Sequence, residues 1–293
     1  MNLKTYLATR QKTIDRALDR YLPKENVRPA TIHKAMRYSL FAGGKRLRPI
    51  LCLAAAEACG GKIDNALPLA CAMECIHTYS LVHDDLPSMD NDDFRRGRPT
   101  CHKVFGDGIA VLAGDALLTI AFEIVTRAKP TPRYDMSILL REVAVAAGSQ
   151  KLIAGQVADL EAEGEKATRD RVRYIHENKT AAILTTSVRL GAMSANANQK
   201  QLSAITKFGR ALGLAFQIID DILDVTQTSE KLGKSAGKDI AAMKATYPAV
   251  IGLENSRAEA RRLTGVAHDA LSTFGTKAEA LHALANYLLE REY

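Results

Sequence analysis

The segment ALGLAFQIIDDILDV, residues 211–225, is apolar on nearly every face when it is read as a helix. A helix that is hydrophobic almost all round lies at the centre of a bundle, where other helices cover it. Residues 67–81 have the same character, and they also lead into a group of carboxylates. Both segments therefore predict central helices that carry acidic side chains.

Stretches with the apolar period of a helix cover much of the remaining chain, whereas alternation with period two is scarce. The clearest of these stretches are residues 64–85, 109–127, 134–163, 169–193 and 199–225. No Gly/Ser-rich linker and no internal repeat of solenoid period divides the chain. The sequence predicts an all-α bundle of roughly ten or more helices, folded as a single domain over residues 1–293. Two charged segments, residues 92–100 and 231–238, are predicted to be loops.

Gln217, Asp220, Asp221 and Asp224 stand at positions i, i+3, i+4 and i+7 within the opening segment. That spacing places all four side chains along one stripe of a helix. An acidic stripe is often only a solvated face, but here Ile, Leu and Phe side chains occupy the other faces. Two carboxylates one turn apart can bind the same cation, so this stripe is a candidate metal site.

The sequence HDDLPSMD, residues 83–90, is the other carboxylate group. Asp84 and Asp90 are six residues apart, a spacing that a straight helix would not align. Pro87 predicts that the helix ends near Asp85, and the following turn is expected to bring Asp90 back toward Asp84. Carboxylates in such apolar sequence are costly unless positive charge compensates them. Two converging groups suit hard divalent cations, and Mg²⁺ held together with substrate phosphates is the usual case.

Cationic residues accompany both carboxylate groups. The turn GGKRLRP, residues 43–49, combines two glycines with three cations, and such backbone freedom with Arg forks suits a phosphate group. Two further pairs follow the carboxylate groups, namely Arg95 with Arg96 and Lys234 with Lys238. Each run taken alone could be a solvated face. Together they predict a diphosphate that is clamped between metal ions and Lys or Arg side chains.

The net charge of +7 is concentrated near the N-terminus, because residues 1–48 hold twelve Lys or Arg against three Asp or Glu. A basic arm can bind nucleic acid, but aromatic interleaving and nucleic-acid motifs are absent, so we expect no nucleic-acid partner. No run of about 18 apolar residues predicts a membrane span, and the N-terminus has no signal-peptide core. Five cysteines give no disulfide framework, which favours buried thiols and a cytoplasmic location.

The order and spacing of six segments make the chain resemble the polyprenyl diphosphate synthases, and more narrowly the bacterial farnesyl diphosphate synthases. The segments are GGKRLRP (43–49), ECIHTYSLVHDDLPSMDNDDFRRGRPTCH (74–102), GQVADL (155–160), NKTA (178–181), FQIIDDILD (216–224) and GKSAGKD (233–239). The resemblance implies a prenyltransferase of isoprenoid biosynthesis, an all-α bundle around a deep central cavity that is usually a homodimer. It also implies three Mg²⁺ ions that join an allylic diphosphate to both aspartate motifs. The implied reaction is head-to-tail condensation of isopentenyl diphosphate with dimethylallyl and geranyl diphosphate, which gives farnesyl diphosphate and diphosphate.

The site residues that the resemblance implies carry over position by position. The implied metal ligands are Asp84, Asp85 and Asp90 on one side and Asp220 on the other, with Asp221 and Asp224 acting through water or by holding the ligands. The implied isopentenyl diphosphate site consists of Lys45, Arg48, His77 and Arg96. The implied allylic diphosphate site consists of Arg95, Lys179, Thr180, Gln217, Lys234 and Lys244. The residues implied in catalysis are Asp84, Asp85, Asp90, Lys179, Asp220 and Lys234.

His77 also aligns with Asp84 by spacing alone, because the two residues are seven apart and lie on one helix stripe. A histidine that simply completes the core is the alternative for this position.

Product length is expected to depend on Tyr79 and Ser80, which precede Asp84 by five and four residues. In this family, an aromatic residue at the first of these positions, with two extra residues inside the first motif, accompanies a C15 limit. The alternative is that Tyr79 belongs simply to the core, since Tyr is common in packed interiors.

Other functions share parts of this sequence pattern. Geranyl or geranylgeranyl diphosphate synthases share the reaction type. A class I terpene cyclase would give no reason for GGKRLRP, and a noncatalytic synthase subunit would be expected to lose carboxylates.

Overall fold

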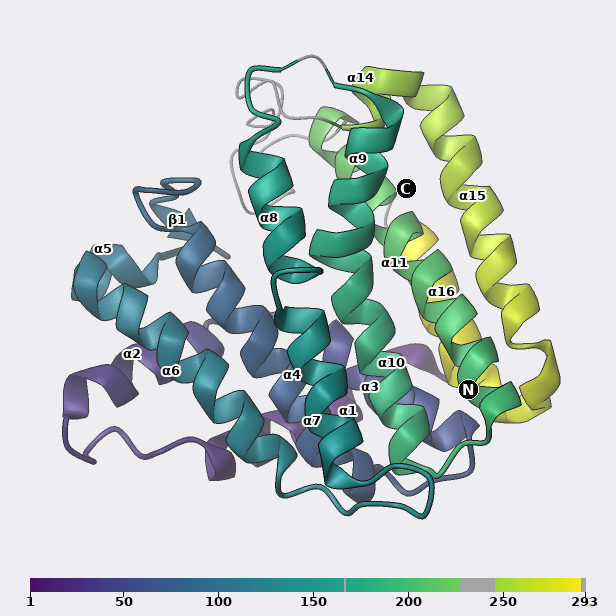
Figure 1. The fold of residues 1–293 in the computed structure, drawn as a ribbon, viewed down its shortest axis with the longest axis horizontal. Coiled ribbons are helices and arrows are strands. Elements are labelled where there is room, and N and C mark those ends of the chain that lie inside the picture. Colours follow the sequence, from purple (N-terminus) through teal and green to yellow (C-terminus); the bar gives the residue numbers. More distant parts are fainter. Residues whose placement is uncertain (166, 227–245, 291–293) are drawn as a thin grey trace.

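Helices account for almost all regular structure in the computed structural model of the chain, which describes residues 1–165, 167–226 and 246–290 (Figure 1). The first half forms α1 (Leu3–Tyr21), α2 (Ala30–Leu40), α3 (Leu47–Ala58), α4 (Ile63–Asp84), α5 (Cys101–Phe105), α6 (Asp107–Val125) and α7 (Met136–Ala147). The second half forms α8 (Leu152–Leu160), α9 (Arg169–Ile175), the π-helical segment η1 (His176–Ala181), α10 (Ala182–Ser194), α11 (Gln199–Thr226), α14 (Tyr247–Ile251), α15 (Leu253–Ala270), the 3₁₀ segment η2 (Ser272–Ala278) and α16 (Glu279–Glu290). The predicted all-α bundle of roughly ten or more helices is confirmed.

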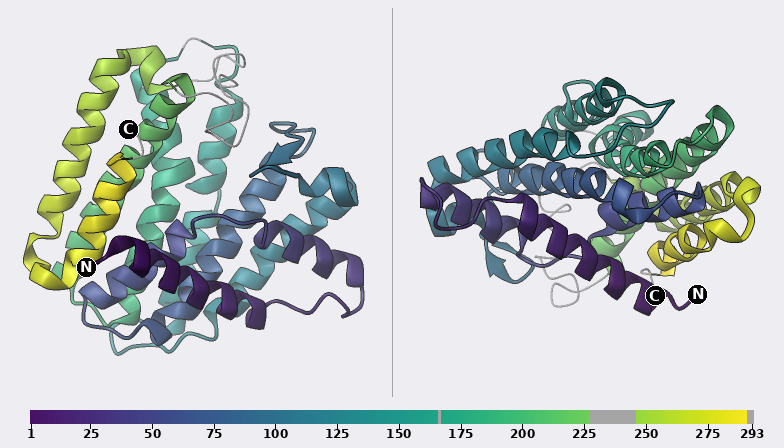
Figure 2. Two further views of the ribbon diagram at one scale, coloured as in Figure 1. Left: turned by 180° about the vertical axis from the view of Figure 1, so that it is seen from behind. Right: turned by 90° about the horizontal axis from the view of Figure 1, so that it is seen from below.

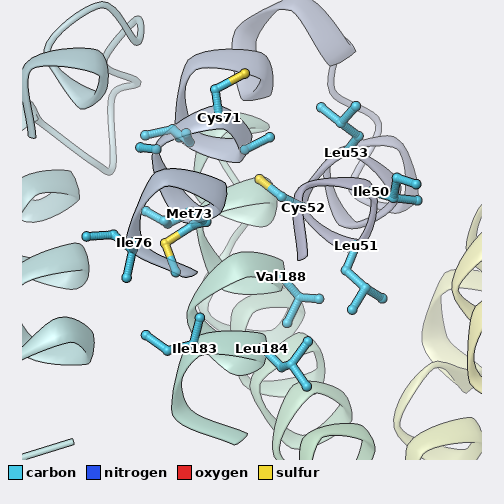
Figure 3. Packing of buried hydrophobic residues seen from close by; sticks show 14 of the residues in the cluster. Ile50, Leu51, Cys52, Leu53, Cys71, Met73, Ile76, Ile183, Leu184 and Val188 are labelled. Atoms are coloured by element: carbon cyan, nitrogen blue, oxygen red, sulfur yellow. The ribbon is translucent and has the colours of Figure 1, made fainter. Parts of the chain in front are cut away.

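The centre of the bundle is formed where α3, α4 and α10 pack together (Figure 3). Leu51 of α3, Met73 of α4 and Leu184 of α10 are fully buried there. The part of α4 between Ala66 and Val82 is buried on nearly every face. The sequence prediction of a central helix over residues 67–81 is therefore confirmed.

The second predicted central helix, α11, joins two groups of buried apolar side chains. Its first half, with Phe208, packs into the large group that also includes α3, α4 and α10. Its second half, with Ile218 and Ile222, packs into a smaller group with α9, α14 and α15. Because α11 is held along its length, the carboxylates near its C-terminal end have a fixed position.

Two faces of the molecule differ in the helices that form them. Helices α6, α7 and α8 lie in front in Figure 1, whereas α1 crosses the opposite face, as Figure 2 shows from behind and from below. By length and composition alone, α6 and α11 are apolar enough to cross a membrane. Both pack within the bundle, α6 along α4 and α11 along α15, and the core helices of a bundle meet the same criterion.

The structure departs from the sequence predictions in two places. The stretch 134–163 is not one helix, because Gly148 ends α7 in an extended conformation and α8 begins only at Leu152. Within the predicted loop 92–100, the strands β1 (Phe94–Arg95) and β2 (Arg98–Pro99) form a short antiparallel hairpin. The predicted loop 231–238 lies outside the described residues.

Candidate active site

The first carboxylate group lies where α4 ends. The backbone N–H of Asp90 donates to the carbonyl of Asp84 at 2.8 Å, and that of Asp92 donates to the carbonyl of Asp85 at 3.2 Å. The turn that follows Pro87 therefore brings Asp90 back beside Asp84, as the sequence predicted.

Asp85 is buried and already bound by a cation of the protein. Arg95 of β1 donates from Nε to both carboxylate oxygens of Asp85, at 2.8 and 2.9 Å, and from Nη2 to Oδ1 at 2.6 Å. Such a charge-assisted pair fixes both side chains. It links the hairpin to the end of α4, so two residues predicted to bind metal and allylic diphosphate lie against each other.

Arg96 turns the other way, toward the glycine-led turn before α3. Arg96 and Gly97 both have positive φ, 54° and 74°, as the tight turn of a two-residue hairpin requires. The Arg96 guanidinium donates from Nη1 to the carbonyl of Gly43. Gly44 has φ of +119°, a backbone conformation that favours glycine, and a Cβ there would also displace the Arg96 guanidinium. The hairpin thus places Arg96 against GGKRLRP.

The three cations of that turn have different roles. Arg46 is buried and paired within the protein, because Nε donates to Asp15 at 2.9 Å and Nη1 donates to Glu74 at 2.9 Å. It therefore braces the turn against α1 and α4. Lys45 is exposed, with its Nζ 5.4 Å from the centre of the Tyr287 ring.

Arg48 and His77 share one positively charged environment. Burial lowers the pKa of Arg48 to about 10, while the carboxylates of Glu74 and Asp220 act in the opposite direction. Burial, together with Arg48 and Arg96, lowers the pKa of His77 well below its usual value. His77 is therefore neutral near pH 7, and Arg48 keeps its charge. The interaction with Asp220 shows that Arg48 of α3 acts across the site on the second carboxylate group.

The stripe on α11 forms a hydrogen-bonded row with the neighbouring segments. Thr180 of η1 donates to the Gln217 amide oxygen at 2.7 Å, and Gln217 Nε2 donates to Asp221 Oδ1 at 3.3 Å. The backbone N–H of Tyr247 donates to Asp221 Oδ2 at 2.9 Å. Asp221 and Asp224 are both buried, whereas Asp220 is partly exposed. Asp220 is thus the most accessible of the three carboxylates of the stripe.

Lys179 reaches the site because the chain between α9 and α10 is wound as a π-helix. Such segments are short and are frequent at functional sites. Lys179 Nζ lies 2.7 Å from Asp159 Oδ2 on α8. Gly155 permits this contact, since a Cβ there would lie 2.3 Å from the Lys179 backbone nitrogen.

His176, the first residue of η1, contacts the second carboxylate group. Its Nε2 lies 3.4 Å from Asp221 Oδ2, and its ring is stacked on Tyr247 with centroids 5.3 Å apart. Burial lowers the pKa of His176 to about 3, so the ring is neutral near pH 7. Its Nδ1 is buried and has no hydrogen-bond partner within the part of the chain that the structure describes. A neutral ring beside Asp221 leaves the negative charge of that carboxylate in place.

Asp84 carries the clearest sign that the site needs added positive charge. Burial raises the pKa of Asp84 to about 6; Lys179 opposes this shift, and the carboxylate of Asp90 adds to it. Mg²⁺ prefers negatively charged oxygen ligands. The carboxylates of Asp84 and Asp90 are therefore suitable ligands for this ion. Across residues 1–165, 167–226 and 246–290, no three His, Cys, Asp or Glu side chains are gathered closely enough to hold a metal ion. The individual ligand assignments therefore stay predictions.

Tyr79 is buried on α4, one turn and a residue before Asp84, with 6% of its surface exposed. Burial and the nearby Asp84 carboxylate raise its pKa to about 12. Ser80 donates to the carbonyl of His77 at 2.9 Å and is partly exposed. A small, open recess lies beside the Asp85–Arg95 pair, between α2, α4 and the hairpin. The deep central cavity that the resemblance implies stays a prediction.

Comparison with known proteins agrees with this architecture. A family model described as polyprenyl synthetase matches residues 29–284. The chain belongs to the polyprenyl synthetase family. A member of this family from Catharanthus roseus, named geranylgeranyl pyrophosphate synthase, is 50% identical over 295 residues, which is 99% of this chain and 82% of that protein. The same kind of name predominates among similar curated members.

Solved structures of the polyprenyl synthetase family share the fold. A putative farnesyl-diphosphate synthase from Marinomonas sp. MED121 is 39% identical, with a TM-score of 0.83 and coverage of 99% of both chains. The geranyltransferase from Helicobacter pylori, complexed with magnesium and isoprenyl diphosphate, is 32% identical, with a TM-score of 0.84 and coverage of 97% of this chain and 98% of that one. The chain therefore has the isoprenoid synthase fold, as predicted.

The raised pKa of Asp84 leads to a prediction for this polyprenyl synthetase. Because the folded-state value lies above the ordinary 3.8, the ionised carboxylate destabilises the fold fully above about pH 6. That effect declines as the pH falls from 6 toward 3.8 and is absent below it. We expect Mg²⁺ at about 100 times its Kd at pH 7.5 to add about 2–3 kcal/mol of stability there. Near pH 5.5 the same concentration should add about 1 kcal/mol less, because protonation of Asp84 weakens binding about fourfold. Thermal unfolding with and without Mg²⁺ measures this difference. Equal stabilisation at both pH values would contradict the assignment.

Two predicted site residues lie outside the described part of the chain, and three residues that hold the site together were not predicted. Lys234 and Lys244, which were predicted to bind the allylic diphosphate, lie outside the described residues. Sequence reasoning gave no role to Asp159, His176 or Glu74, which hold Lys179, Asp221 and Arg46 respectively. Glu74 had a usable signal, because a lone acid in the apolar run of α4 requires a buried cation.

Proposed function

We propose that the chain catalyses Mg²⁺-dependent head-to-tail condensation of isopentenyl diphosphate with dimethylallyl and geranyl diphosphate, and that farnesyl diphosphate is the product. The observation that carries the proposal is the electrostatic coupling across the site. Lys179 of η1 acts on Asp84 of α4, and Arg48 of α3 acts on Asp220 of α11. These two interactions support one shared volume between α3, α4, η1 and α11, as two diphosphates with their metal ions would require.

The two substrates would bind on different sides of this volume. Isopentenyl diphosphate would meet the cationic side near Arg48 and Arg96, with the neutral His77 ring beside them and Lys45 at the entrance. The allylic diphosphate would lie between the two carboxylate groups, within reach of Lys179 and of the Thr180–Gln217 pair. Arg95, held on Asp85, would present its remaining N–H groups to the same diphosphate.

The chemistry follows from this arrangement. Mg²⁺ bound by the aspartates would supply positive charge to the diphosphate as it leaves the allylic carbon. Lys179 and Arg95 add fixed positive charge at the same place, where the negative charge develops. The double bond of isopentenyl diphosphate then attacks the allylic cation, and the released diphosphate is the base that takes the proton. Exclusion of water by the apolar faces of α4 and α11 protects the cation from hydrolysis.

The C15 product is supported by Tyr79. Its ring is buried beside Asp84, on the helix along which a growing chain would extend away from the metal ions. An aromatic ring at that depth would stop a chain that a smaller residue would let pass.

Geranylgeranyl diphosphate is the second candidate product. The predominance of geranylgeranyl names among the curated relatives supports C20 better than C15. Those names describe the relatives, whereas Tyr79 is a feature of this chain. Both products require the same first condensation, so the two candidates differ only in where elongation stops.

Chain length gives a direct prediction. We expect Tyr79→Ala to deepen the pocket and to shift the product from C15 to C20 or longer, because removal of a buried ring leaves a cavity. Chromatography of dephosphorylated products measures the shift. Tyr174→Ala removes an exposed ring of α9 and should leave the product unchanged.

Two outcomes would count against the C15 proposal. If the unmodified chain already releases C20, the second candidate replaces the first. If the unmodified chain releases C15 and Tyr79→Ala does the same, Tyr79 does not set the length.

A homodimer and a cytoplasmic location complete the proposal. An exposed apolar face supports the dimer, since Leu112 of α6, Val145 of α7 and Val157 of α8 are 54%, 46% and 46% exposed. Exposed apolar side chains that gather on one face mark an interaction site. Four buried free thiols are consistent with a reducing compartment. Sedimentation of the purified chain tests the dimer, and a monomer at micromolar concentration would contradict it.

A further inference from the structure

The outer side of α1 carries a row of basic side chains. Lys4, Lys12, Arg16 and Arg20 are all exposed, while Ile14 and Leu18 bury the opposite side of the helix. We call these four cations the basic face. None of them takes part in a salt bridge with any residue that the structure describes.

The acidic residues of α1 do not neutralise this face. Asp15 binds Arg46, and Asp19 binds Arg37 and Lys24. Both acids of α1 are therefore occupied by cations outside the basic face. The outer side of α1 therefore keeps a net positive charge, because no acid of the helix is left to pair with its cations at i+3 or i+4.

Two apolar side chains lie at the ends of the basic face. Met1 is 51% exposed directly before α1, and Val27 is 46% exposed in the loop that follows it. Clusters of Lys or Arg on a helix attract anionic lipid headgroups, and exposed apolar side chains beside them can add contact with the bilayer. The face also lies on the side of the molecule opposite to α7, away from the apolar face assigned to the dimer (Figure 2).

The inner side of the same helix contacts the substrate turn. Gln11 Nε2 donates to the carbonyl of Gly44 at 3.1 Å, and Asp15 accepts from Arg46 at 2.9 Å. A surface bound to the outer side of α1 would therefore lie one helix diameter from the proposed isopentenyl diphosphate site.

We propose that the basic face docks this protein on a bilayer that contains anionic phospholipid. The choice of lipid rests on the proposed function, because a C15 or C20 diphosphate is an amphiphile whose hydrocarbon partitions into a bilayer. Nucleic acid is disfavoured because the aromatic rings of α1 are covered, with Arg10 over Tyr6 and Arg127 over Tyr21. They are not available for base stacking.

Sedimentation of the full chain with vesicles tests this proposal. Vesicles of phosphatidylcholine with about 30% phosphatidylglycerol should bind the chain, pure phosphatidylcholine vesicles should not, and added salt should weaken the binding. Lys12→Glu/Arg16→Glu/Arg20→Glu should lower the partition coefficient at least about tenfold. The matched control is Lys200→Glu/Lys207→Glu/Arg210→Glu, which makes the same charge change at exposed positions of α11 and should bind like the unmodified chain.

Three results would overturn the proposal: no binding to anionic vesicles, an equal loss of binding in both triple variants, or equally tight binding to a DNA duplex of the same charge. Circular dichroism and turnover in vesicle-free solution establish that the α1 variant is folded, and Lys12→Gln/Arg16→Gln/Arg20→Gln gives a milder test if it is not. The vesicle-binding measurement contains no substrate. Its result therefore does not depend on whether the chain catalyses the condensation reaction.

Discussion

Asp84→Asn is expected to lower kcat for condensation on the order of a thousandfold, because the change removes one carboxylate of the proposed metal site and keeps the shape of the side chain. Burial raises the pKa of Asp84 to about 6, and the same burial is the reason that we expect a large loss of kcat. Positive charge that neutralises a buried carboxylate is bound more tightly than positive charge at an exposed one. Steady-state kinetics at saturating Mg²⁺ measures kcat.

Asp115→Asn is the matched control, since Asp115 is an exposed carboxylate on the neighbouring helix α6. It should retain kcat within about twofold. Near-normal turnover by the Asp84 variant would refute the metal assignment. A large loss in both variants would point to a general charge effect instead.

Arg48→Gln is expected to raise KM for isopentenyl diphosphate about a hundredfold and to change KM for the allylic substrate little. Arg48 is a protonated guanidinium whose charge acts on Asp220 and on neutral His77. Loss of charge-assisted hydrogen bonds to a phosphate removes about 3 kcal/mol of binding. Kinetics with each substrate varied in turn separates the two KM values.

The control for Arg48 is Arg127→Gln, which removes an exposed guanidinium paired with Glu123 on α6. It should leave both KM values unchanged. If Arg48→Gln raised KM for the allylic substrate and left that for isopentenyl diphosphate unchanged, the two substrate sites would be assigned the wrong way round.

The parts of the fold and site that the sequence predicted well depend on local spacing. The stripe of Gln217, Asp220, Asp221 and Asp224 is a property of one helix, so its alignment follows from the period of 3.6 residues. The return of Asp90 to Asp84 follows from Pro87 and a short turn. The central position of α4 and α11 follows from their apolar character on all faces.

The parts that could not be predicted depend on tertiary partners. The binding of Arg95 to Asp85 requires the hairpin to fold back on α4, and no spacing rule gives that contact. Arg46 looked like a phosphate ligand by its position, but Glu74 on another helix holds it. The support of Asp221 by His176 depends on the π-helical winding of η1, which has no sequence signature of its own. The break after α7 was missed because a single glycine interrupts otherwise continuous helical periodicity.

In the proposed reaction two diphosphate substrates react together at one site, and release of diphosphate distinguishes this reaction from cyclisation or hydrolysis. Purified chain with Mg²⁺ and geranyl diphosphate should release diphosphate only when isopentenyl diphosphate is present, with one diphosphate for each isopentenyl unit consumed. Release at the same rate from geranyl diphosphate alone would indicate a cyclase or a hydrolase and would contradict the account.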